Sequence, residues 1–268
     1  MVTQPDAEQA RLSNADLAEV MRLLRGVDSV ELKTTIPVGA HRATVLGLPL
    51  DPVEAQPRQV FFFDTPDLAL DAAGVVVRAR RIQGGRGDTV VKLRPAEPSA
   101  LPAEVRRSAA FNVELDALPG GFVCSASFKG KSSGQEIRDA VDGAMPLRKL
   151  LAKEQRAFYA QHAPSDIDLD ALIPLGPIFL LKAVFGVDLS GQPGALEQRM
   201  VAELWLYPDG SRILELSTKC LPSEAFQIAM EMRTYLGERG VPVIGGQQTK
   251  TRAAMAFFRT ESEAETEA

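Results

Sequence analysis

The chain has 268 residues, of which 45% are hydrophobic and 24% are charged, enough apolar material for one large core or for one barrel with helices. The formal net charge is −5, and four acidic residues lie in the last eight positions, so the rest of the chain is close to neutral. A near-neutral body argues against general nucleic-acid binding, which needs a net basic face, but it leaves room for a local basic pocket.

The sequence shows no sign of a targeting or membrane segment. No apolar run reaches the roughly 18 residues that a membrane span needs, and the N-terminus is polar. Cys124 and Cys220 lie far apart without metal-ligand spacing, which favours reduced core residues. We therefore expect a cytoplasmic protein without a membrane or nucleic-acid partner.

The first half of the chain is predicted to be rich in strands. Residues 1–12 are expected to form a disordered tail, and apolar residues spaced three and four apart predict a helix over 13–25. Strands are predicted at 29–36, 60–64, 74–82, 89–94, 109–116 and 122–128. The glycine-rich segment 84–87 joins two of these strands with no helix after it, so it predicts a hairpin and not a nucleotide loop.

The hydrophobic period then changes and later returns. Helices are predicted at 135–141 and 146–162, followed by strands at 178–187, 200–207 and 212–219 and a helix at 222–240. Because strands flank the helices on both sides, we expect a single α+β domain over 13–258 with a helical insertion at about 133–163. Residues 259–268 are expected to form an acidic disordered tail.

Charged residues recur two or four positions apart in five predicted strands. Residues at such spacings point to the same face of a strand. The pairs are Glu31 and Lys33, Arg78 and Arg80, Lys92 and Arg94, Glu114 and Asp116, and Glu215 and Lys219. Apolar residues alternate with them, at Val77 and Ala79, Val91 and Leu93, Val113 and Leu115, and Leu214 and Leu216.

Two interpretations fit this alternation. In one, the charges lie on the solvent face of an antiparallel sheet. In the other, the sheet closes into a barrel whose apolar face packs outward against helices and whose charges line a wet lumen. The two interpretations predict opposite burial for the same residues, and the pattern alone does not choose between them.

A charged lumen would have a defined chemistry. Arginine and lysine side chains pair with phosphate oxygens, and the cations available are Lys33, Arg78, Arg80, Lys92, Arg94, Lys182 and Lys250. Carboxylates supply the hard oxygen ligands that Mg²⁺ or Mn²⁺ prefers, and the candidates are Glu31, Glu114, Glu203 and Glu215. Cations and metal-binding carboxylates together are what metal-assisted phosphoryl transfer needs.

Several motifs resemble the CYTH, or triphosphate-tunnel, family in order along the chain. Ser29–Lys33 is similar to the Glu-x-Glu-x-Lys signature of the family's first strand, and Phe62–Leu70 followed by Gly74–Arg80 resembles its second and third strands. Lys92-Leu93-Arg94, the strand around Glu215 and the pair Thr249-Lys250 match further positions, so the resemblance spans roughly 28–258. It implies a closed eight-stranded antiparallel barrel, covered by helices, and therefore a charged lumen.

The resemblance also implies roles for individual residues. Glu31 and Lys33 become the candidate catalytic residues. The cations that match the family's triphosphate-holding positions are Lys33, Arg78, Arg80, Lys92, Arg94 and Lys250, and Lys182, a further candidate, stands in a region where the family often has arginine. Glu31 and Glu215 match the family positions that hold the metal or the attacking water, and the charged-lumen interpretation adds Glu114 and Glu203 as candidate metal ligands. The implied activity is hydrolysis of tripolyphosphate, thiamine triphosphate or a nucleoside triphosphate, with adenylyl cyclase as a minority alternative.

The sequence departs from the family pattern at two carboxylate positions. Ser29 stands where the first glutamate of the signature is usual, and Ser217 stands where a late-strand carboxylate is common. Neutral hydroxyls hold a divalent metal less tightly than carboxylates do. The departures favour a non-catalytic phosphate or nucleotide binder, whereas the retained Glu31, Lys33 and Glu215 favour an enzyme, and both alternatives stay open.

Overall fold

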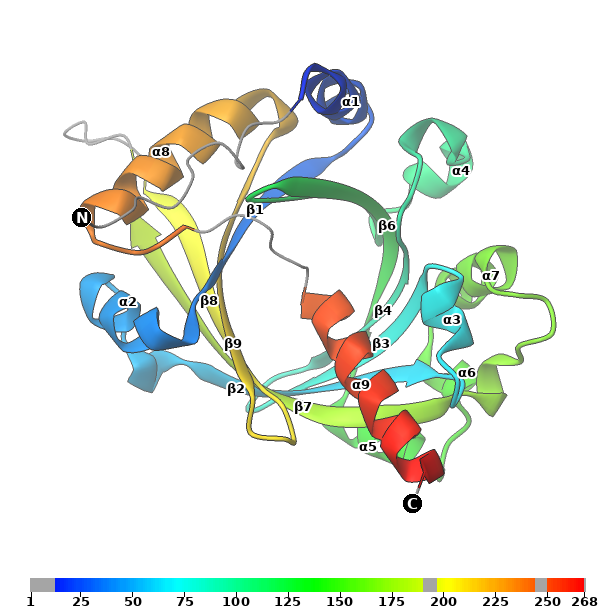
Figure 1. The fold of residues 1–268 in the computed structure, drawn as a ribbon. Coiled ribbons are helices and arrows are strands. Elements are labelled where there is room, and N and C mark those ends of the chain that lie inside the picture. Colours follow the sequence, from blue (N-terminus) through cyan, green and yellow to red (C-terminus); the bar gives the residue numbers. More distant parts are fainter. Residues whose placement is uncertain (1–12, 190–196, 244–249, 268) are drawn as a thin grey trace.

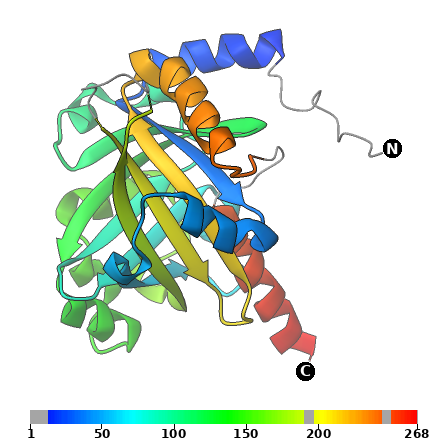
Figure 2. The same ribbon diagram turned by 90° about the vertical axis from the view of Figure 1, so that its left-hand side faces the viewer.

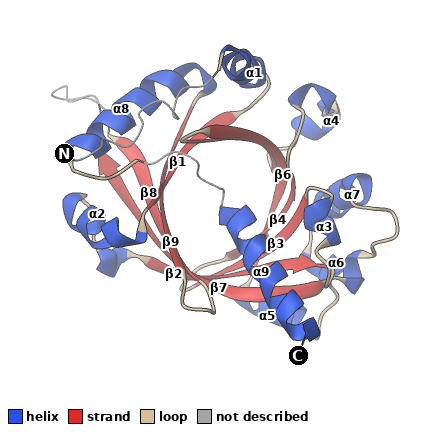
Figure 3. Ribbon diagram, in the orientation of Figure 1, coloured by secondary structure: helices blue, strands red, loops and turns tan. Residues whose placement is uncertain are grey.

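The computed structural model describes residues 13–189, 197–243 and 250–267, in which nine strands close into one barrel (Figures 1 and 3). The strand order is β1-β5-β6-β4-β3-β2-β7-β8-β9, and β9 pairs back onto β1. The strands are β1 (Ser29–Ile36), β2 (Gln56–Asp64), β3 (Val75–Ile82), β4 (Gly87–Leu93), β5 (Phe111–Leu118), β6 (Gly121–Ser132), β7 (Ile173–Val187), β8 (Gln198–Leu206) and β9 (Arg212–Cys220).

The predicted closed barrel is confirmed, but two details of the prediction are wrong. The barrel has nine strands, which are the nine segments predicted along the chain, and not the eight that the family resemblance implied. One neighbouring pair, β1 and β5, runs parallel. The second difference follows from the first, because a closed ring with an odd number of strands cannot alternate direction throughout.

Helices cover the outside of the barrel. On one side lie α1 (Asn14–Leu24), α2 (His41–Gly47) and α8 (Ala225–Glu238); Figure 2 shows α2 and α8 in front of the strands and α1 along the top. The chain between β6 and β7 holds α5 (Gly134–Val141), α6 (Leu147–Leu150) and α7 (Lys153–His162). The remaining helices are α3 (Ala69–Ala72), α4 (Ala103–Arg106) and α9 (Lys250–Glu267), with short 3-10 helices at Val38–Ala40, Pro52–Glu54, Pro98–Ala100, Leu169–Ala171 and Pro222–Glu224. None of the described helices is long and apolar enough to cross a membrane.

Two helix predictions differ from the structure. The single helix predicted at 146–162 is broken into α6 and α7, because Leu151 and Ala152 are extended and buried Gln155 accepts a hydrogen bond from the Ala152 amide at 2.9 Å. The acidic segment predicted to be disordered from residue 259 instead continues α9 as far as Glu267. The predicted tail at 1–12 lies outside the described residues.

The apolar residues that alternate with the charges form the outer core. Val77, Ala79 and Val91 are buried in one cluster with Ile137 of α5 and Phe158 of α7. Helix α5 lies against β3, and α7 lies against β4 and β6. The apolar faces of these strands therefore point outward to the helices, which leaves the charged faces pointing into the barrel.

A second apolar cluster fills one end of the barrel interior. Helix α9 lies across this end (Figures 1 and 2). Its Ala254, Met255 and Phe258 are buried against inward-facing residues, among them Phe62 of β2 and Trp205 of β8. The chain therefore plugs one end of its own barrel with apolar side chains, and the charged side chains occupy the rest of the interior.

Candidate functional site: a lumen with an acidic and a basic arc

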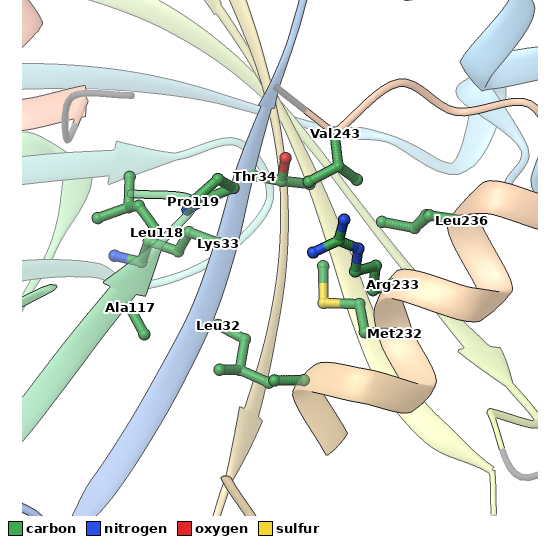
Figure 4. A pocket seen from close by; sticks show the side chains of 11 residues that line it. Leu32, Lys33, Thr34, Ala117, Leu118, Pro119, Met232, Arg233, Leu236 and Val243 are labelled. Carbon is green, nitrogen blue, oxygen red and sulfur yellow. The ribbon is translucent and has the colours of Figure 1, made fainter. Parts of the chain in front are cut away.

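Solvent reaches the inward-facing charges although the barrel is closed. The side chains of Arg78 and Arg80 on β3 are 23% and 20% exposed, and that of Lys182 on β7 is 18% exposed. On β1, too, the charged side chain points away from the covering helix: Figure 4 shows Lys33 extending away from Arg233 and Leu236 of α8. The charged-lumen interpretation therefore describes these strands, and the solvent-face interpretation does not.

The lumen charges are sorted by strand. Apart from Asp88 on β4, the carboxylates come from the neighbouring strands β8, β9, β1 and β5, and these are Glu203, Glu215, Glu31, Glu114 and Asp116. Cations come mainly from the neighbouring strands β4, β3, β2 and β7, and these are Lys92, Arg78, Arg80, Arg58 and Lys182, with Arg94 directly after β4. Because each set occupies adjacent strands of one ring, an acidic arc faces a basic arc across the lumen.

Three carboxylates of the acidic arc meet at the parallel strand pair. Glu31, Glu114 and Asp116 each offer one oxygen, and these oxygens lie within 4.8 Å of one another. The register places Ser29 opposite Glu114 and Glu31 opposite Asp116, and the Ser29 hydroxyl donates a hydrogen bond to Glu114 Oε2 at 3.5 Å. Three hard oxygens at this spacing suit a divalent cation.

Cations hold this carboxylate group in place. Lys33 Nζ lies 3.1 Å from Glu31 Oε2 and 2.7 Å from Asp116 Oδ1, and Arg94 pairs with the other oxygen of Asp116. Burial alone would lower the pKa of Lys33, but the charges of Glu31, Glu215 and Glu114 outweigh it, and the pKa is raised. Burial would likewise raise the pKa of Glu31, but Lys33 and other lysines lower it. Both side chains therefore stay charged at neutral pH.

The other two carboxylates of the acidic arc are held separately. Lys250, at the start of α9, lies 2.7 Å from Glu215 Oε1 and also pairs with Glu203, while Lys182 Nζ lies 3.5 Å from Glu203 Oε1. The charges of Glu215 and Glu203 overcome the burial of Lys250 and raise its pKa. Of the four predicted metal ligands, the structure thus brings Glu31 and Glu114 together and holds Glu203 and Glu215 against Lys250.

The basic arc is less fully paired than the acidic arc. Arg80 lies 2.6 Å from Asp88, and Arg78 lies 3.7 Å from the same carboxylate. Burial lowers the pKa of Arg78 to about 10, with a smaller contribution from Arg80. Burial, together with the charge of Arg94, lowers the pKa of Lys92 well below its usual value. No described carboxylate lies within ion-pair distance of Lys92.

Sequence reasoning missed two carboxylates of the lumen. Asp116 is fully buried between Lys33 and Arg94, and it completes the three-carboxylate group. The sequence does indicate Asp116 as a lumen residue, because it lies two positions after Glu114 and therefore shares its strand face. Asp88 lies opposite Arg80 in the register of β3 and β4, which the predicted hairpin at 84–87 would also have indicated.

Trp205 belongs to the plugged end. Its side chain is buried in the cluster with Met255 and Phe258, so it packs the interior at that end. The ammonium group of Lys250 lies 5.5 Å from the centre of the Trp205 ring, within cation–π range. The ammonium group of Lys250 therefore interacts with the Trp205 ring as well as with Glu203 and Glu215.

Two solved structures share this fold. A candidate adenylyl cyclase from Hippeastrum, described as having a dominant triphosphatase activity, aligns with a TM-score of 0.62 at 17% identity, covering 87% of this chain and 96% of the other. A candidate adenylate cyclase from Bacillus halodurans aligns with a TM-score of 0.54 at 14% identity, covering 84% and 96%. No family model and no curated protein matches the sequence. The resemblance to the CYTH family is thus confirmed at the level of the fold.

Proposed function

We propose that the lumen binds a triphosphate group together with a divalent metal and hydrolyses the triphosphate. The observation that carries this proposal is the division of the lumen into a basic arc and an acidic arc. A triphosphate is a chain of anionic oxygens, which the arginines and lysines of the basic arc can pair with. Neutral or singly charged ligands would leave most of these cations uncompensated.

The residues present fit Mg²⁺ or Mn²⁺. Both oxygens of Asp116 are buried in ion pairs with Lys33 and Arg94, and Glu31 and Glu114 bring two further carboxylates to the same place. Oxygen-only ligands of this kind are what hard divalent cations prefer. We infer that Glu31, Glu114 and Asp116 would hold the metal, which would offset the negative charge on the phosphate oxygens.

Different side chains of the lumen would then bind the phosphates, offset charge and activate water. Arg78, Arg80 and Lys92 bind and orient the phosphate oxygens, which fixes the phosphorus atoms along the lumen. Lys33 would offset charge within the acidic arc, since it contacts Glu31 and Asp116 from the inner face of β1. Glu215 is almost fully buried beside Lys250, and we infer that it would orient a water molecule for attack and accept its proton.

The test is a phosphate-release assay with tripolyphosphate, thiamine triphosphate and ATP, each with Mg²⁺ and with Mn²⁺. We expect release from at least one substrate that depends on the metal and is lost in Asp116→Asn. A parallel assay for cyclic AMP separates hydrolysis from cyclase activity. Release that is equal with a chelator, or unchanged in Asp116→Asn, would overturn the assignment of the three carboxylates.

A second candidate is a non-catalytic triphosphate binder, and one observation favours it. Ser29 and Ser217 place neutral hydroxyls on the acidic arc, and Ser217 is buried opposite Lys33 in the register of β1 and β9. Under this alternative, tripolyphosphate binds but no tested metal supports release of phosphate. Binding without turnover in the same preparation would therefore select the binder over the enzyme.

A further inference from the structure

A cleft lies beside α9, on the side of the helix that does not plug the barrel. It has a volume of about 810 Å³ and separates α9 from the ends of β3, β4 and β6. From α9 it is lined by Thr251, Arg252, Ala256, Arg259 and Thr260. These positions recur at helical spacing, so α9 has an apolar inner face and a polar face toward this cleft. We call this space the α9 cleft.

The α9 cleft is basic. Arg94, Arg252 and Arg259 line it, and among the residues whose side chains the structure describes Asp71 is the one acidic residue of the lining. Arg259 lies 3.5 Å from Asp71, and the charges of Arg259 and Arg252 both oppose the rise that burial causes in the pKa of Asp71. The arginines of α9 are exposed, so an anion in the cleft can contact them without further opening of the fold.

The α9 cleft and the lumen share lining residues. Val76 on β3 and Val123 on β6 face inward, and both also line the cleft. Arg94 lines the cleft and also pairs with Asp116 of the three-carboxylate group. One guanidinium group therefore lies at the junction between the lumen and the outside, next to the place where phosphate would be cleaved.

The backbone fixes Arg94 at this junction. The Arg94 amide donates a hydrogen bond to the Gly74 carbonyl oxygen at 2.8 Å. Gly74 has φ +75°, and a Cβ atom there would lie 2.5 Å from the Arg94 carbonyl oxygen, so this close approach requires glycine. The position of Arg94 therefore does not depend on α9 alone.

We propose that the α9 cleft is a binding site for inorganic phosphate, through which orthophosphate cleaved in the lumen leaves the protein. The release role rests on the proposed function, but phosphate binding does not. The apolar contact between α9 and the barrel leaves no path for an anion along the inner face of the helix. In the α9 cleft, on the other side of the helix, an anion can pair in turn with Arg94, Arg252 and Arg259. Arginine forks suit the tetrahedral oxygens of phosphate.

The test compares the double variant Arg252→Gln/Arg259→Gln with a control that removes two exposed cations elsewhere, Arg107→Gln/Lys153→Gln. Orthophosphate binding is measured by calorimetry and by ³¹P NMR line broadening. We expect the wild type and the control to bind phosphate, the double variant to bind it at least several-fold more weakly, and Arg252→Lys/Arg259→Lys to recover part of the binding. Equal phosphate binding in the double variant and the control would overturn the site.

Product inhibition tests the release role. In the wild type we expect a noncompetitive component of inhibition by orthophosphate against tripolyphosphate, which disappears in Arg252→Gln/Arg259→Gln while the KM for tripolyphosphate stays unchanged. Purely competitive inhibition in the wild type would overturn the release role. If the wild type hydrolyses no triphosphate, the proposed function fails, and the calorimetry still decides whether the α9 cleft binds phosphate.

Discussion

Ser29 and Glu114 lie opposite each other in the parallel pair of β1 and β5, and the hydroxyl of Ser29 donates to Glu114 Oε2 at 3.5 Å. The serine stands beside a carboxylate group that already has three members. A fourth carboxylate at this position would add a ligand oxygen where a metal is expected, and it would add negative charge to a group that Lys33 and Lys219 now offset.

Ser29→Glu is therefore expected to lower the metal concentration that gives half-maximal phosphate release by several-fold, because one more carboxylate strengthens divalent metal binding. The measurement is a Mg²⁺ and Mn²⁺ titration of the initial rate. Ser29→Gln is the matched control, since it has the same length without the charge. A metal requirement that does not change in Ser29→Glu would place the metal away from Glu114.

Glu215→Gln is expected to lower the rate of phosphate release by roughly a hundredfold or more, the usual loss when a general base is removed. Tripolyphosphate binding should remain, because the cations of the basic arc are untouched. Single-turnover rates and calorimetry measure the two effects separately. If the variant loses binding and rate together, Glu215 acts by holding Lys250 and not on the attacking water.

Tripolyphosphate is expected to raise the melting temperature in low salt, because a ligand that binds only the folded state stabilises it and because it relieves repulsion within the basic arc. Arg80→Ala should weaken binding by roughly tenfold to a hundredfold, since hydrogen bonds to charged groups contribute roughly 1.5–3 kcal/mol. Added salt should reduce the shift in both proteins. The absence of any shift with millimolar tripolyphosphate would count against the enzyme and the binder alike.

Triphosphate binding is expected to take up a proton through Lys92. Burial and the charge of Arg94 lower the pKa of Lys92 in the free protein, and a bound polyanion would raise it again. Affinity should therefore be greatest below the pKa of the free protein and fall as the pH rises toward the pKa of the complex. Calorimetry in two buffers of different ionisation enthalpy measures the uptake. Lys92→Arg should bind without it, and uptake in that variant would assign the proton elsewhere.

Phe258→Ala is expected to destabilise the protein by about 3 kcal/mol, because it leaves a cavity in the cluster that plugs the barrel. The side chain is buried and contacts the ring of Phe62, with centroids 6.3 Å apart. Denaturant unfolding measures the change. Arg259→Gln, next to it on the exposed face, should change stability by less than about 1 kcal/mol. Equal losses in the two variants would mean that α9 is not held by its apolar face.

The charged residues that alternate with apolar residues along the strands could be predicted from the sequence. Alternation of Arg78 and Arg80 with Val77 and Ala79 indicates which residues share a face, and the family resemblance indicates that this face is the interior. Asp116 shares a strand face with Glu114, but the sequence does not indicate which carboxylate of another strand lies next to it. Only the parallel pairing of β1 with β5 places it beside Glu31.

The role of α9 could not be predicted from the local pattern. The acidic residues after Arg259 are typical of a disordered tail, and Ala254, Met255 and Phe258 become informative only when the end of the barrel that they fill is known. The charged pair of Glu203 with Lys250 likewise joins two segments that are 47 residues apart in sequence. Contacts of this kind depend on the closed barrel and not on either segment alone.

The strand order also sets when the barrel can close during synthesis. The first strand pairs with the last, so Glu31 meets Lys219 only after the ribosome has released nearly the whole domain. Until then β1 and β8 each present an unpaired edge, which is the feature that promotes aggregation of incomplete sheets. Such distant pairing also slows folding. A nascent chain stopped before β9 should therefore require a chaperone, although all of its basic arc has already been made.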